Sequence, residues 1–202
     1  MMSTKLLLLV TLSCLAAVTA HGTFCCMSGT WSATMSDIQV IASGQHITSD
    51  YYYDSYHLTV AIQYYDFGTS TRKRVFRNRV VTDYAKRVRY YIAADGTCTK
   101  GNITETMLPN CIPVTSTYLG TSYIGTKKNG VKYDSWQIAL AGLNATVSYT
   151  NPDCILVGMA VVGTPTVPVN QALFFSGYKL GIQNPSVFDV PISCYRPRPR
   201  PI

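Results

Sequence analysis

The sequence predicts an all-β fold built from antiparallel strands. Segments with apolar residues at every second position recur along the chain, as expected of strands that bury one face. Turn-forming residues such as Gly, Pro, Asn and Asp separate these segments at intervals of about ten residues. Long stretches with helical periodicity do not occur. These three observations favour an antiparallel sheet over an α/β or helical architecture.

Residues 1–20 have the pattern of a secretory signal peptide. Lys5 precedes a short apolar run, and Val18, Thr19 and Ala20 are small enough for cleavage before His21. The alternative, an uncleaved anchor, is disfavoured because the apolar run is too short to span a membrane, and no later segment is apolar over a sufficient length. We therefore expect a secreted, extracellular protein that does not span the membrane, with the lysosomal lumen as the alternative location.

One domain is expected between the signal peptide and a basic tail. Removal of residues 1–20 from the 202-residue chain leaves 182 residues, which suits a single β domain at residues 21–195. Residues 196–202 alternate Arg with Pro, so this tail lacks the backbone donors that a strand needs and should be extended and solvated.

The first predicted strands lie at residues 22–48 and 55–66. In the first range Trp31 and Met35 are expected to face inward, and Ile38 alternates with Val40. Residues 55–66 give the clearest strand pattern of the chain, with large apolar and aromatic residues at every even position. Later strands are predicted at residues 118–124, 131–140, 155–162 and 172–182.

A hairpin is predicted within residues 72–98. Asp83 opens a tight turn that ends at Lys86, and a second turn around Gly96 places Cys98 just past the end of a strand. The second arm alternates between two faces: Val88, Tyr90 and Ile92 occupy one, and Arg87, Arg89 and Tyr91 occupy the other. Residues 100–117 then form a long polar connection held by Cys111.

The cysteines indicate disulfides. Of seven cysteines, Cys14 leaves with the signal peptide and six remain, an even number in an oxidising compartment. A zinc site is disfavoured because no pair has the Cys-x-x-Cys spacing. Spacing alone does not choose among the pairings, which involve Cys25, Cys26, Cys98, Cys111, Cys154 and Cys194.

Half of the cations of the mature chain lie between Arg72 and Arg89, and two interpretations of this basic cluster stand. In the first, the cluster binds an extracellular polyanion or glycan rather than nucleic acid. In the second, the cations keep the strand surfaces soluble and prevent pairing between sheet edges. The second interpretation is favoured. Its members are Arg72, Lys73, Arg74, Arg77, Arg79, Lys86, Arg87 and Arg89.

Two N-glycosylation sequons begin at Asn102 and Asn144. Asn144 falls on the polar face of a predicted strand in which Ala145, Val147 and Tyr149 occupy the other face. We expect glycans at both positions.

No constellation of catalytic residues is apparent, and we expect the protein not to be an enzyme. His21, His46 and His57 are the only histidines, the mature cysteines are needed for bridges, and no pair of carboxylates is set apart as an acid and a base. A few aspartates would suffice for a calcium ion, but no EF-hand loop is present and the sequence defines no metal site.

Two segments carry a resemblance to a known family. VTDYAKRVRYYIAADGTC at residues 81–98 and LGIQNPSVFDVPISC at residues 180–194 resemble the ependymin-related secreted glycoproteins. The resemblance implies a strongly curved antiparallel sheet that forms a half-barrel around an apolar cavity, similar to bacterial carriers of lipoproteins. It also implies a Cys98–Cys194 bridge and a bridge from Cys154 to Cys25 or Cys26, which leaves Cys111 for the remaining cysteine.

The resemblance also implies calcium association and a homodimer, and it leaves two functions open. In the first, the protein carries a hydrophobic small molecule or lipid in its cavity. The alternative is an extracellular matrix or cell-adhesion glycoprotein that acts through calcium, glycans and the basic surface. For the carrier, strand alternation predicts a shared concave face made of Leu58, Val60, Ile62, Val88, Tyr90 and Ile92.

Overall fold

The structure is a computed structural model that describes residues 24–45, 47–67, 73–140, 143–164 and 167–195. The predicted signal peptide and the Pro-Arg tail lie outside the described residues.

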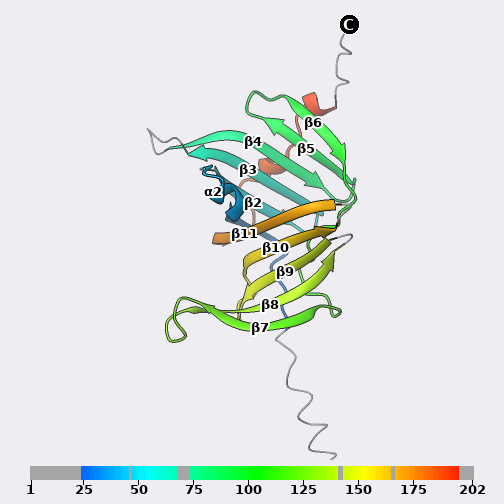
Figure 1. The fold of residues 1–202 in the computed structure, drawn as a ribbon. Helices are drawn as coiled ribbons and strands as arrows, with labels where there is room; N and C mark the ends of the chain where they lie inside the picture. The colour runs from blue at the N-terminus through cyan, green and yellow to red at the C-terminus, as the bar shows by residue number, and fades with distance from the viewer. Residues whose placement is uncertain (1–23, 46, 68–72, 141–142, 165–166, 196–202) are drawn as a thin grey trace, which may run out of the picture.

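The described residues form one antiparallel sheet of eleven strands, which confirms the all-β prediction. The order across the sheet is β6-β5-β4-β3-β2-β1-β11-β10-β9-β8-β7, and the sheet is strongly curved (Figure 1). The elements are β1 (Thr30–Asp37), α2 (Ile38–Ala42), β2 (Ile47–Asp54), β3 (Thr59–Phe67), β4 (Arg74–Asp83), β5 (Val88–Ala93), β6 (Cys98–Asn102), β7 (Thr117–Ile124), β8 (Val131–Leu140), β9 (Leu143–Thr150), β10 (Leu156–Thr164), β11 (Val167–Leu180) and the 3₁₀ turns η1 (Pro185–Phe188) and η2 (Ile192–Cys194).

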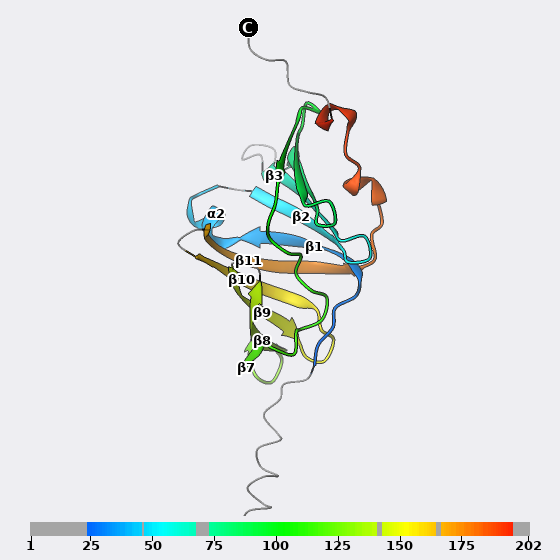
Figure 2. The same ribbon diagram turned by 90° about the vertical axis from the view of Figure 1, so that its right-hand side faces the viewer.

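Two runs of hairpins make up the sheet and meet where β1 pairs with β11. Strands β1 to β6 follow one another in sequence and in space, as do β7 to β11, so β6 and β7 are the two edges. The connection between these edges crosses from one end of the curved sheet to the other, as the green trace in Figure 2 shows. The curvature and this connection together enclose the concave face.

Two tight turns with the same construction shape the β1–β6 half. Asp54 accepts hydrogen bonds from the backbone N–H groups of Tyr56 and His57, at 3.0 and 3.1 Å, and Asp83 accepts one from Lys86 at 2.9 Å. Aspartate side chains favour such turns because they satisfy backbone donors locally. The turn predicted at residues 83–86 is therefore confirmed.

The apolar core lies on the concave face. Trp31, Tyr53 and Val147 are fully buried there, and Trp31 stacks on Tyr51 and Tyr53 with ring centroids 5.2 and 5.4 Å apart. Trp31 and Met35 face inward as the sequence predicted. This core runs through both halves of the sheet, from β3 to β8.

A second apolar cluster lies on the convex face of β3, β4 and β5. The segment after β11 folds back over these strands and buries Val187 against them (Figure 2). Arg79 holds the segment in place, because its guanidinium group donates to the carbonyl oxygens of Ser186 at 2.9 Å and Asp189 at 2.7 Å. In this half the sheet is therefore covered on both faces.

Three predicted boundaries are wrong. Ile38 and Val40 lie in α2 rather than in a strand, because the Asp37 carboxylate caps the N–H of Gln39 at 2.9 Å and starts a helical turn. The strand predicted at 55–66 begins only at Thr59, after the Asp54 turn. Cys98 opens the edge strand β6, which occupies the first part of the predicted connection.

Candidate ligand-binding cleft

A cleft of about 400 Å³ opens on the concave face of the sheet. Its volume lies in the range of roughly 300 to 1,000 Å³ that is typical of small-molecule sites. The apolar part of the lining comes from six strands and α2, and consists of Met35, Val40, Ile47, Val60, Ile62, Val80, Met159 and Leu173. Its polar part consists of Asp37, Ser49, Tyr51, Tyr64, Thr82, Tyr84, Arg89, Tyr91 and Gln171.

The connection between β6 and β7 fills the part of the concave face next to the cleft. Leu108 and Ile112 are buried in the concave core, and the backbone oxygen of Leu108 accepts a hydrogen bond from the Tyr53 hydroxyl at 2.8 Å. The bridge between Cys26 and Cys111 ties the connection to the N-terminal segment. A covalently anchored segment thus covers another part of the concave face, and none of its residues is in the described lining of the cleft.

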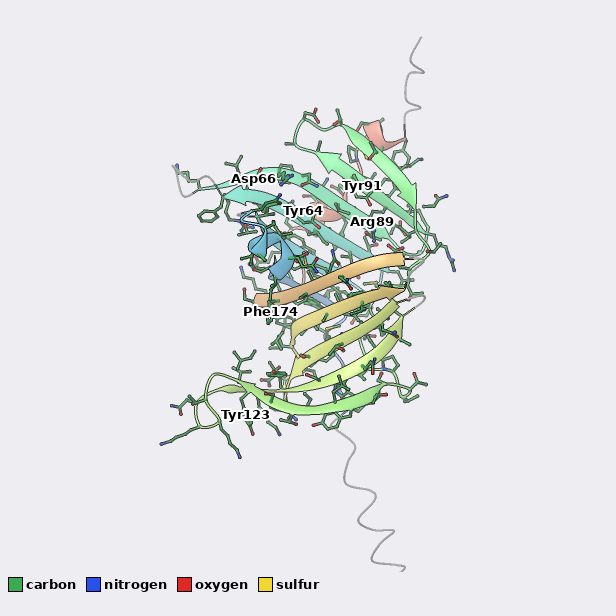
Figure 3. All side chains as sticks on the ribbon, in the orientation of Figure 1. Tyr64, Asp66, Arg89, Tyr91, Tyr123 and Phe174 are labelled. Carbon is green, nitrogen blue, oxygen red and sulfur yellow. A yellow bond between two sulfur atoms is a disulfide. The ribbon has the colours of Figure 1, made fainter. Side chains whose placement is uncertain are left out.

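Arg89 provides the cationic group of the cleft. Its Nε donates to Thr82 Oγ1 at 3.0 Å, and its Nη2 donates to Glu105 Oε1 at 2.5 Å. Glu105 belongs to the connection after β6, so this ion pair joins the sheet to that connection. Figure 3 shows Arg89 and Tyr91 on the same strand, with Tyr64 across from them.

Burial changes the acidity of the tyrosines in the cleft. It raises the pKa of Tyr64 and of Tyr84, and the nearby Arg89 charge opposes part of each rise. Burial also raises the pKa of Tyr51 well above its usual range. These hydroxyls therefore keep their protons at physiological pH and act as hydrogen-bond donors.

The structure brings together only two of the six predicted cavity residues. Val60 and Ile62 line the cleft. Leu58 lies in the turn before β3, with a φ of 52° and an exposed side chain.

The placement of Val88, Tyr90 and Ile92 in the cavity is wrong. They belong to the cluster on the convex face. The period-two alternation in β5 is as predicted, but its apolar face packs under the C-terminal segment, and Arg89 and Tyr91 turn toward the cleft instead. The sequence could not distinguish these faces because a second covering segment makes the convex side apolar as well.

Several cleft residues were missed by sequence reasoning. The sequence predicts only that Met35 faces inward, and it assigns no role to Met159 and Leu173. The last two come from β10 and β11, which reach the cleft only because β11 pairs with β1. A contact between strands so distant in sequence leaves no local pattern.

Disulfides within the described residues link Cys25 to Cys154, Cys26 to Cys111 and Cys98 to Cys194. The Cys98–Cys194 bridge has the partners that the family resemblance implied. For Cys154 the resemblance left two partners open, and in the structure Cys154 is bonded to Cys25 rather than to Cys26. Each bridge ties a segment outside the sheet to a strand end or to another such segment.

Both sequon asparagines are exposed. Asn102 ends the edge strand β6, and Asn144 lies on β9 opposite the buried face formed by Ala145, Val147 and Tyr149. The position of Asn144 on the polar face is thus confirmed, and glycan attachment stays a prediction at both sites.

Acidic neighbours pair with several members of the basic cluster. Arg74 pairs with Asp50 at 2.8 Å, Arg77 with Asp66 at 3.4 Å and Lys86 with Asp83 at 2.6 Å. Arg74 also lies over the ring of Tyr65, 4.0 Å from its centroid. The carboxylates therefore compensate much of the positive charge of Arg74, Arg77 and Lys86.

Metal ligands do not gather within the ranges that the structure describes: no three His, Cys, Asp or Glu side chains lie together there. His57 pairs with Asp54 at 2.7 Å in the turn before β3, while His21 and His46 lie outside the described residues. Calcium association therefore stays a prediction. None of the helices in the described part of the chain has the length and apolarity that a membrane crossing needs.

The fold and the cleft define an all-β protein whose single curved antiparallel sheet carries an open site lined by both apolar and polar side chains. The chain belongs to the ependymin family, whose model, described as Ependymin, matches residues 72–194. A comparison of the sequence with curated proteins finds no match. The crystal structure of an uncharacterized conserved protein from Thermus thermophilus resembles the chain with a TM-score of 0.49 and 10% identity, over 81% of this chain and 86% of that chain.

Proposed function

We propose that this protein is a secreted glycoprotein that binds a hydrophobic small molecule or lipid in its concave cleft and carries it outside the cell. The observation that supports this function is the cleft itself, which exposes apolar side chains from strands of both halves of the sheet. Membership of the ependymin family and three disulfides fit an extracellular location.

Apolar burial supplies the driving force for binding in this proposal. Each square ångström of apolar surface removed from water contributes about 25 cal/mol, from which the cost of association is subtracted. The basic cluster plays no part in this driving force, since Arg89 is the one member among those the structure describes that lines the cleft. Binding of a neutral hydrophobic ligand should therefore be insensitive to salt.

The alternative function, a matrix or adhesion glycoprotein acting through a basic surface, receives less support. Arg74, Arg77 and Lys86 are paired with carboxylates, so their charge is largely compensated where a polyanion would bind. Calcium association, glycans at Asn102 and Asn144, and a homodimer remain compatible with the carrier function and form part of the proposal.

Two matched substitutions on one strand test the carrier function. Val80 is 9% exposed and lines the cleft, whereas Val75 is 56% exposed and lies outside it on the same strand. Val80→Trp should fill the cleft and weaken binding of a neutral fluorescent probe such as 1-aminoanthracene by at least about tenfold, and Val75→Trp should leave binding unchanged. Circular dichroism would establish that both variants are folded. Equal probe affinity in the two variants, or a collapse of binding at moderate salt together with a loss in Arg77→Ala, would favour the surface-interaction function.

A further inference from the structure

The donors of the cleft converge on one side of it. Arg89 is the one Lys or Arg side chain in the described lining, and Thr82 and Tyr91 are its neighbours in the sheet, on β4 and β5. Tyr84 follows directly after β4, and Tyr64 reaches the same region from β3 (Figure 3). This side of the cleft therefore presents a guanidinium group and tyrosine hydroxyls to any molecule that enters.

Arg89 retains donors for a ligand. Its bonds to Thr82 and Glu105 use Nε and one N–H of Nη2, and the Tyr84 and Tyr91 hydroxyls also lie within its hydrogen-bonding reach, which leaves at least one of its five N–H groups for a ligand. The side chains of Arg89 and Glu105 are 30% and 28% exposed, so the ion pair is reached by solvent rather than sealed in the core, and Arg89 itself lines the cleft.

The acidic group of the lining is Asp37, which ends β1 and has one oxygen occupied by capping α2. Both charged groups act on Tyr64: burial raises the pKa of its hydroxyl, the Arg89 charge lowers it, and the Asp37 charge raises it. The apolar side chains of Ile62 and Val80 line the cleft as well. Such an arrangement suits a molecule with an aliphatic chain and a polar end that accepts hydrogen bonds.

We propose that Arg89, Thr82, Tyr64, Tyr84 and Tyr91 form a head-group site, and that the cleft selects molecules with one aliphatic chain ending in an anionic oxygen group, a carboxylate or a phosphate. This inference rests on the proposed carrier function and specifies the ligand class. The cleft volume, near the lower end of the usual range for ligand sites, favours one chain over several.

Glu105 is the competitor of the ligand in this arrangement. Without ligand, its carboxylate balances Arg89, and it also accepts a hydrogen bond from the backbone N–H of Thr104 at 3.2 Å. An anionic head group adds a second acceptor to the same guanidinium group and is repelled by Glu105. Removal of the Glu105 charge should therefore strengthen the binding of anionic ligands and leave neutral ligands unaffected.

Four probes with the same chain separate the head-group site from the carrier function. Decanoate, decyl phosphate, decanol and decylamine are each used to displace 1-aminoanthracene from the unmodified protein. We expect decanoate or decyl phosphate to bind at least about tenfold more tightly than decanol, and decylamine to bind most weakly. The comparison of carboxylate with phosphate tells which anion the site prefers.

Variants assign this preference to Arg89. Arg89→Met keeps the length of the side chain without its charge and should abolish the preference for the anion while decanol binding changes by less than about twofold. Arg89→Lys should retain part of the preference, and Glu105→Gln should increase it. If Arg89→Met is unfolded, two other results decide whether the head-group site stands. They are the ranking of the probes on the unmodified protein and the effect of Glu105→Gln on the anion preference.

The two proposals fail in different ways. Equal affinity for decanoate, decyl phosphate and decanol in the unmodified protein, or no change of anion affinity in folded Arg89→Met, would overturn the head-group site and leave the carrier function standing. Binding of 1-aminoanthracene without displacement by any of the four probes would likewise overturn only the head-group site. If neither 1-aminoanthracene nor any of the four probes binds, the carrier function and the head-group site are removed together.

Discussion

The two halves of the sheet bury their strands in different ways. In β9 the side chains of Ala145, Val147 and Tyr149 form the concave core, and Asn144 on the other face is exposed. In β5 Tyr90 is buried on the convex face at 4% exposure, and its neighbour Tyr91 lies on the concave cleft at 46% exposure. The more buried face is thus the inside of the curve in β9, as it is in β1 and β2, and the outside of the curve in β5.

The C-terminal segment causes this difference. Residues 181–195 cover β3, β4 and β5 from outside, whereas the convex face of the β7–β11 half carries exposed Val131, Val162 and Phe174. The concave face of the β1–β6 half is left less filled, and the cleft forms there. The position of the cleft therefore depends on a segment that contributes no residue to its described lining.

The largest expected effect concerns the inner face of β9. Val147→Asp places a charge at a fully buried position without a partner and should destabilise the protein by at least about 4 kcal/mol, or prevent its secretion. Asn144→Asp, on the exposed face of the same strand, should be neutral. Chemical denaturation of both variants measures the difference, and normal stability of Val147→Asp would show that the faces of β9 are reversed.

Removal of the bridge between Cys98 and Cys194 should act on the other half. The bridge closes a loop with a sequence separation of 96 residues, and its loss should cost roughly 3 to 5 kcal/mol in the chain-entropy model. Hydrogen exchange of a variant with both cysteines changed to Ser should rise in β5 and in residues 181–195 and stay low in β9. A uniform rise of hydrogen exchange across the sheet would contradict the account in which the C-terminal segment covers only β3, β4 and β5.

Arg79 gives a smaller effect on the same covering segment. Arg79→Met removes two hydrogen bonds from a charged donor to backbone oxygens and should cost about 1.5 to 3 kcal/mol. Arg77→Met, two residues earlier on β4, breaks an exposed ion pair and should cost at most about 1 kcal/mol. Thermal unfolding compares the two, and equal losses would mean that Arg79 does not anchor the C-terminal segment.

Alkaline pH should affect the core shared by both halves. Burial raises the pKa of Tyr53 and of Tyr149 well above the usual range. The folded state then binds these protons more tightly, so their contribution is fully present below the unfolded pKa of about 10 and is lost as the pH rises above it, by about 1.4 kcal/mol per pH unit for each group. Urea unfolding between pH 9 and 11.5, with Tyr149→Phe as control, measures this slope, and an equal slope in the variant would contradict the burial of the Tyr149 hydroxyl.

Local patterns predicted much of the fold, because strand alternation and turn residues act over a few positions. The register of β9, the turn at Asp83 and the inward position of Trp31 all followed from the sequence. The family resemblance supplied the expected curvature and the partners of Cys98 and Cys194.

Contacts between segments that are distant in sequence, such as the C-terminal segment over β5, could not be predicted in the same way. The assignment of Val88, Tyr90 and Ile92 to the cavity assumed that an apolar face points to the inside of the curve, which holds only where the outside is bare. The roles of Met159 and Leu173 depend on the pairing of the first strand with the last, and no local signal marks it.

Mass spectrometry of the organic extract from protein purified from its native source tests most directly whether the concave cleft holds a ligand. The extract should contain a hydrophobic molecule in near-stoichiometric amount. When Val80→Trp and Val75→Trp are secreted from the same cells, the molecule should be depleted in the first and retained in the second. An extract of the unmodified protein without any such molecule, or equal amounts in the two variants, would contradict the assignment of the cleft.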